Sequence, residues 1–157
     1  MNNMNNYEQT LKFPSAEDIE LLHQRSRKEF EDSICHNREA PAKFLKAWLQ
    51  GVKVIGWEFF QYNSPLNNSS APPVKSIEDV TNKWQVCPNS EYIIGNIGVI
   101  PNYHAILLAS MCSFYNSNWG GELMRSVGIN GLADISARLD THDSKIIAEL
   151  LINYNGW

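Results

Sequence analysis

Cysteine is scarce in this chain of 157 residues, and its positions show no pairing pattern. Cys35, Cys87 and Cys112 are far apart, and no C-x-x-C pair occurs. The sequence therefore supports neither a zinc knuckle nor a redox motif. An odd number of cysteines without a disulfide framework is typical of a reducing compartment. We expect a cytoplasmic protein that folds without disulfides.

Long apolar runs and an excess of positive charge are also missing. No segment reaches the ~20 apolar residues that a membrane span requires, and the polar start MNNMNNYEQT is unlike a signal peptide. Thirteen basic residues against 17 acidic ones give a net charge of −4. Because binding to phosphates needs a basic face, we expect neither a nucleic acid nor a membrane as partner.

Formal charge is almost absent between residues 84 and 121, where Glu91 is the one charged side chain. Inside this window, residues 100–116 read IPNYHAILLASMCSFYN. Pro101 suits the first turn of a helix, and apolar residues then recur at helical steps and fill much of the other side. A helix that is apolar nearly all round lies inside a core or an assembly. We therefore predict a central helix near 101–116.

Two helices are predicted before this window. The first follows Ser15, a good N-cap, and carries a narrow apolar stripe on an otherwise charged surface. This pattern predicts that one face packs against the rest of the protein and that the other is exposed to solvent. The second begins near Pro41 and has the clearest helical period in the chain. Gly51 and Gly56 leave open whether this helix continues or breaks into a strand. The stripe of the first helix consists of Ile19, Leu22, Ser26, Phe30 and Ile34.

The remaining segments complete the expected fold. Residues 63–74, rich in Pro, Asn and Ser, predict a loop, and residues 91–100, rich in β-branched side chains, predict a short strand or strand pair. Shorter helical patterns follow the central helix. We expect a mainly α fold (α+β with a small, minor β element) of about five to six helices around the central helix. Residues 1–12 are expected to form a flexible tail, and 13–157 a single globular domain.

The strongest candidates for metal chemistry are Asp140, His142 and Asp143, because carboxylates with an imidazole suit several divalent ions. The pair His142-Asp143 is similar to the His-Asp dipeptide of the metal-dependent HD phosphohydrolases, with His104 in place of the upstream histidine. The site of that family normally has a further Asp well downstream, whereas Glu149 is the one acidic residue after Asp143. Helix capping is the alternative explanation for these residues.

Two further residues have a structural and a catalytic interpretation. His104 on the central helix is either a hydrogen-bonded core histidine or a catalytic group. Glu58, among aromatic residues, either points to solvent or lies in an apolar wall, where a carboxyl can act as a general acid. No cofactor is expected, because the glycines follow no nucleotide-binding pattern.

Aromatic residues near predicted loops are of the type that anchors protein interfaces. They are Tyr62, Tyr115, Trp119 and Tyr154. We therefore expect a protein-binding module without catalytic activity, such as a toxin-neutralising immunity protein or a subunit of a larger assembly; its oligomeric state is open. One alternative is a small hydrolase, metal-dependent or not, that uses His104 with Asp140, His142 and Asp143, or Glu58. Another is a ligand pocket lined by Trp48, Trp57 and His104.

Overall fold

The computed structural model of the chain describes residues 15–60 and 74–156, and of residues 35–37 only the backbone. The described part contains six α-helices, three short 3-10 helices and no strand. The prediction of a mainly helical fold is therefore confirmed. The chain divides into two units, residues 1–36 and 37–157. The single domain over 13–157 stays a prediction, and the tail (1–12) and nearly all of the loop (63–74) lie outside the described residues.

The first helix, α1 (Ala16–Ile55), begins as predicted after Ser15. The Ser15 hydroxyl oxygen accepts a hydrogen bond from the backbone N–H of Asp18 (3.1 Å), and the Asp18 carboxylate accepts one from the backbone N–H of Ser15 (2.9 Å). These bonds lower the pKa of Asp18, because they favour its charged form. The reciprocal cap is therefore lost only when the pH falls through that lowered pKa.

α1 continues through Pro41, so the prediction that a second helix begins there is wrong. Proline has no N–H for the carbonyl four residues earlier, so one helical hydrogen bond is missing. Ala40 and Ala42 flank the proline, and alanine is the strongest helix former, which helps the helix to continue. The division into two units falls after His36, next to the carbonyl of residue 37 that lacks its helical partner.

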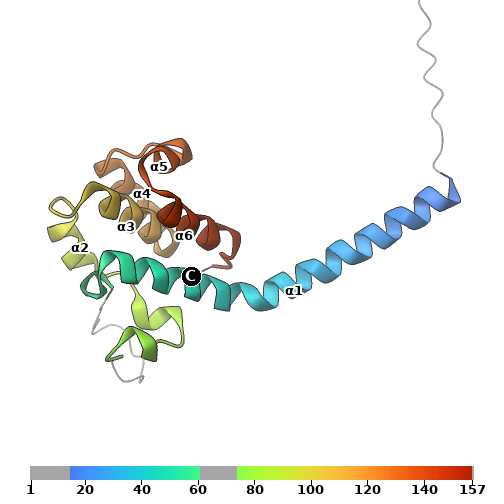
Figure 1. Cartoon of the computed structure of the whole chain (residues 1–157), viewed down its shortest axis with the longest axis horizontal. Coiled ribbons are helices and arrows are strands. Elements are labelled where there is room, and N and C mark those ends of the chain that lie inside the picture. The colour runs from blue at the N-terminus through green and yellow to red at the C-terminus, as the bar shows by residue number, and fades with distance from the viewer. Residues whose placement is uncertain (1–14, 61–73, 157) are drawn as a thin grey trace, which may run out of the picture. The chain divides into compact units, whose positions relative to one another are not determined.

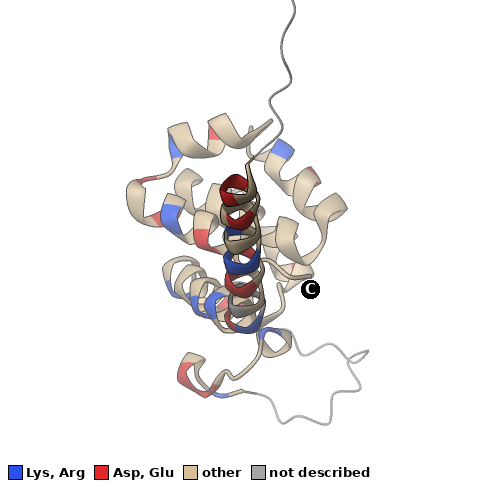
Figure 2. Cartoon of the chain, turned by 90° about the vertical axis from the view of Figure 1, so that its right-hand side faces the viewer, with Lys and Arg blue, Asp and Glu red and all other residues tan. Residues whose placement is uncertain are grey.

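In the first unit, every side chain described from Ser15 to Ile34 is exposed. The apolar stripe that we expected to dock is therefore uncovered within this unit. Leu22 is 57% exposed and Phe30 66% exposed. Acidic and basic residues are both present along this helix (Figure 2).

The core of the second unit begins with the C-terminal part of α1. Trp48 is completely buried, and its indole N–H donates a hydrogen bond to the carbonyl of Val86 (3.0 Å). Its ring stacks on that of Phe44, with 5.9 Å between the centroids, and meets the ring of Phe60 edge-on at 5.6 Å. The apolar residues whose helical spacing we predicted from Pro41 onward thus face the core.

Gly51 does not interrupt α1, which ends at Ile55. A Cβ atom at Gly51 would lie 2.3 Å from the Met111 sulfur, so the glycine permits close approach of another helix. Gly56 has φ of +125°, a conformation that favours glycine. Three 3-10 helices follow along the chain: η1 (Trp57–Phe59), η2 (Ile77–Asp79) and η3 (Lys83–Val86).

The predicted strand over 91–100 is wrong, because α2 (Ser90–Asn96) occupies most of this segment. The Asn89 side chain accepts a hydrogen bond from the backbone N–H of Tyr92 (3.1 Å) and caps the helix. This local cap prevails over the β propensity of the isoleucines, which depends strongly on context.

The helix α3 (Asn102–Tyr115) lies at the centre of the second unit, as predicted. Its eight consecutive residues from Ala105 to Cys112 are all buried. It packs against α4 (Ser117–Ser126), α5 (Leu132–Arg138) and α6 (Thr141–Ile152) (Figure 1). The ring of Phe114 also meets that of Phe44 on α1 edge-on, with 6.1 Å between the centroids. The expected arrangement of helices around a central apolar helix is therefore confirmed.

The contact between α3 and α4 depends on Gly120. Asn116 caps α4 by accepting a hydrogen bond from the backbone N–H of Trp119 (3.0 Å), so the helix contains both Gly120 and Gly121. A Cβ atom at Gly120 would lie 2.3 Å from the backbone of Ser113. The two helices therefore touch backbone to backbone.

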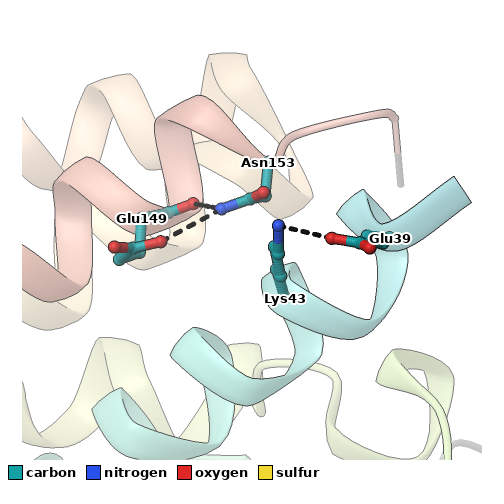
Figure 3. Close-up of polar contacts among 4 residues, drawn as sticks. All are labelled: Glu39, Lys43, Glu149 and Asn153. Atoms are coloured by element: carbon teal, nitrogen blue, oxygen red, sulfur yellow. Dashed lines mark hydrogen bonds and ion pairs between the residues drawn. The ribbon is translucent and has the colours of Figure 1, made fainter. Parts of the chain in front are cut away.

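Polar contacts lie near the end of α6 and on the neighbouring part of α1 (Figure 3). The buried Asn153 side chain donates hydrogen bonds to the backbone carbonyl of Glu149 (2.8 Å) and to its carboxylate (3.2 Å). On α1, Lys43 pairs with Glu39 at 2.7 Å. The Glu39 carboxylate raises the pKa of Lys43, and Glu149 adds a smaller effect of the same sign.

We expect Gly120→Ala to lower the free energy of unfolding by about 1–3 kcal/mol or more, because the new methyl group would overlap backbone atoms of α3. Chemical denaturation followed by circular dichroism measures this change. The matched control is Gly121→Ala, whose Cβ would meet only the flexible end of Arg125, at 3.6 Å. It should be neutral or stabilising by up to about 1 kcal/mol. Equal effects of the two substitutions would contradict the close contact.

Candidate functional site

The predicted metal ligands lie together at the beginning of α6. The Asp140 carboxylate accepts a hydrogen bond from the backbone N–H of Asp143 (2.8 Å), so Asp140 is the N-cap of α6. Asp143 is buried, and its carboxylate oxygen lies 3.1 Å from Nδ1 of the exposed His142. The helix start thus brings all three candidates together.

Asp140, His142 and Asp143 each offer a ligand atom, and these atoms lie within 4.8 Å of one another. Carboxylate oxygens with an imidazole nitrogen could coordinate a divalent ion. Within the described ranges, neither His104 nor Glu58 belongs to this group. Asp140 is already used as a cap, and Asp143 as the partner of His142. Capping therefore explains the cluster without a metal.

His104 and Glu58 occupy separate environments. His104 is half-buried in the first turn of α3, and its ring meets that of Tyr103 edge-on, with 4.4 Å between the centroids. Glu58 is exposed on η1, which agrees with the solvent-facing interpretation rather than with an apolar wall. A hydrolase that combines His104 with the α6 cluster stays a prediction.

A pocket of about 260 Å³ lies beside the end of α1 and η2. Its volume is below the roughly 300–1,000 Å³ of typical ligand sites. Trp57 lines it, as the ligand-pocket alternative expected, but Trp48 and His104 do not. Its other lining residues are Val52, Lys53, Gly56, Lys75, Ser76 and Ile77.

The aromatic residues predicted to bind a partner differ in their exposure. Tyr115 and Trp119 are half-buried and pack against the core. Tyr154 is 45% exposed, and its ring contacts those of Phe44 at 5.8 Å and Phe114 at 5.5 Å. Tyr62 lies outside the described residues. These aromatics have structural contacts, and their role in binding stays a prediction.

A more exposed apolar surface lies in the uncharged window, at α2 and the beginning of α3. Ile94 is 65% exposed, Val99 80% and Tyr103 50%, and Tyr92 is also exposed. We call these four residues the α2–α3 apolar surface. Sequence reasoning missed it because it assigned a strand there. No sequence signal indicated this exposure, because it arises from a helix of seven residues that buries only Ile93 and leaves its other apolar side chains in solvent.

The described cysteines are poor candidates for nucleophiles. Cys87 and Cys112 are buried and form no disulfide. Burial raises the pKa of the Cys112 thiol far above its usual range, so the reactive thiolate does not form at neutral pH. The interpretation of Cys112 as a small buried hydrophobe agrees with this environment.

Comparisons with known proteins suggest no family or function for the chain. The chain matches no family model, and no curated protein or solved structure shows significant similarity to it. Among the described residues, no helix is long and apolar enough to cross a membrane.

We expect Asp140→Ala to lower the free energy of unfolding by about 1 kcal/mol, because α6 loses its N-cap. Asp140→Asn should keep most of the stability, since asparagine caps equally well. Thermal unfolding with and without excess Zn²⁺ or Mn²⁺ measures both effects. If either metal raises the melting temperature of the wild-type chain but not of Asp140→Ala, the cluster binds metal and capping is not its full explanation.

We expect Ellman's reagent to leave Cys87 and Cys112 unmodified in the native protein at neutral pH, because both thiols are shielded from solvent. At most one thiol should react in the native chain, and all three should react after unfolding in guanidinium. Mass spectrometry of the labelled peptides identifies the modified residues. Rapid native labelling of Cys112 would contradict its burial.

Proposed function

We propose that this chain is a protein-binding module, and that the α2–α3 apolar surface contacts its partner. The observation that supports this proposal is the exposure of Ile94, Val99 and Tyr103 in a window whose one formal charge is Glu91. Ile94, Val99 and Tyr103 lie within ten consecutive positions of the chain, and exposed apolar patches are typical of interaction sites. Contact with the partner would remove these side chains from water and stabilise the complex.

The chemistry of this surface favours a protein over a nucleic acid. A phosphate backbone requires basic side chains, and residues 84–121 contain no lysine or arginine. An immunity protein that neutralises a toxin, or a subunit of a larger assembly, would use such a surface without any catalytic group. We propose the cytoplasm as its location, because its cysteines follow no disulfide pattern.

The alternative function is a small hydrolase that uses the α6 cluster. Its support is the proximity of three possible ligand atoms at the start of that helix. We favour the binding proposal, because capping by Asp140 already accounts for part of the α6 cluster.

We expect Val99→Asp to weaken partner binding at least tenfold without changing the melting temperature, because the new charge would be buried only in the complex. The partner is first identified by affinity capture of the wild-type chain from a lysate of its source organism. The dissociation constant is then measured by titration calorimetry with the purified partner. Ile94→Asp tests the same surface at a second position.

The matched control is Leu132→Asp, at an apolar position of similar exposure (73%) on α5. It should leave the affinity unchanged. The proposal is wrong if the wild-type chain captures no stoichiometric partner, or if Val99→Asp and Leu132→Asp bind that partner as tightly as the wild type does.

A further inference from the structure

We propose that the first unit pairs with the same unit of a second copy of this chain, through an antiparallel contact of the helix over residues 16–36. The inference is independent of the partner proposed above. It concerns the helix stripe, defined as Ile19, Leu22, Ser26, Phe30 and Ile34. The four apolar members of the helix stripe are all exposed, from 38% for Ile34 to 66% for Phe30.

The helix stripe occupies one face of the helix. At about 100° per residue, its five members fall within an arc of about 120° around Ser26. Side-chain packing of an apolar face supplies most of the stability of helices in proteins. Every side chain described from Ser15 to Ile34 is exposed, so the first unit itself supplies no such packing.

The order of residues in the helix stripe favours pairing with a second copy whose helix runs in the opposite direction. Leu22 and Phe30 lie four residues before and after Ser26, and Ile19 and Ile34 lie seven before and eight after it. If Ser26 of one copy lies opposite Ser26 of the other, each Leu22 faces the Phe30 of its partner copy. Ile19 then lies about level with Ile34. The small serine side chains at the centre let the two helices approach.

The charges beside the helix stripe do not decide the direction of the pair. Arg25 and Glu29 lie on one edge of the stripe and form an ion pair within the helix at 2.8 Å. In the antiparallel pair this edge faces itself, so Arg25 of each copy comes near both Glu29 and Arg25 of the other, and the attraction and the repulsion offset each other. The direction therefore rests on the order of residues in the helix stripe, and antiparallel helix dipoles attract each other.

The first test is sedimentation equilibrium of the full chain over a range of concentrations. We expect a monomer–dimer equilibrium of the 17.9 kDa chain. Leu22→Asp should weaken the dimer about 100-fold or more, because two leucines leave the interface and two charges enter it. Phe30→Asp should have a similar effect. Neither should change the melting of the second unit, because both residues lie outside it.

Leu21→Asp is the matched control. Leu21 is 59% exposed, against 57% for Leu22, but it lies about 140° from Ser26, on the opposite side of the helix. It should leave the dimer intact. The proposal is overturned if the wild-type chain is a monomer at every concentration. It is also overturned if Leu21→Asp and Leu22→Asp weaken association equally.

Disulfide trapping tests the direction of the pair. In a Cys35→Ser background, chains with Leu22→Cys and chains with Phe30→Cys are mixed and oxidised. We expect a mixed dimer between the two variants and little dimer of either variant alone. Gln24→Cys, at about 160° from Ser26, is the control that should not cross-link. Homodimers of Leu22→Cys and of Phe30→Cys, without the mixed product, would show a parallel pair and overturn the antiparallel arrangement.

Discussion

The second unit depends on the burial of one uncharged helix, α3. Because Ala105–Cys112 are buried without interruption, neighbouring helices must cover α3 on all sides. Such coverage requires short distances between helices, and two glycines provide them. Gly51 on α1 leaves room for Met111, and Gly120 on α4 touches the backbone of Ser113. The hydrogen bond from Trp48 to Val86 then satisfies a polar group inside the apolar core.

Apolar residues are exposed in several places outside this core, and our proposals concern two of them. The α2–α3 apolar surface belongs to the second unit, and the helix stripe belongs to the first. Both present apolar side chains to solvent, which is costly unless another surface covers them. We propose that the α2–α3 apolar surface binds a different protein and that the helix stripe binds a second copy of the chain.

The helical content and the position of α3 could be predicted from the sequence, because both follow from local periodicity and from the absence of charge. The continuation of α1 through Pro41 could not, since Phe44 and Trp48 just after the proline are buried in the core, and tertiary packing of this kind overrides local helix propensity. The strand predicted at 91–100 failed for a related reason. A single capping side chain, Asn89, decided the conformation of a segment whose β-branched residues suggested a strand.

The candidate site was predicted only in part. Asp140, His142 and Asp143 do lie together, and the helix capping that the sequence offered as an alternative explanation accounts for Asp140, although the sequence predicted neither the burial of Asp143 nor its contact with His142. The exposure of Val99 could not be predicted either, because it depends on which side of a short helix and turn the core covers. Conversely, Tyr115 and Trp119 have the composition of interface residues but are half-buried against the core.

Hydrogen exchange of the full chain, measured at low and high concentration by mass spectrometry, tests the central claim most directly: a complete core with two uncovered surfaces. The amides of α3 should be strongly protected at both concentrations, since that helix is buried within one chain. The amides of residues 16–34 should be more protected at high than at low concentration, because a second copy would cover that helix. Those of residues 92–99, which are hydrogen-bonded within α2 and the turn after it, should exchange at the same rate at both concentrations. Rapid exchange in α3 would contradict the complete core. Equal protection of residues 16–34 at both concentrations would contradict their association with a second copy.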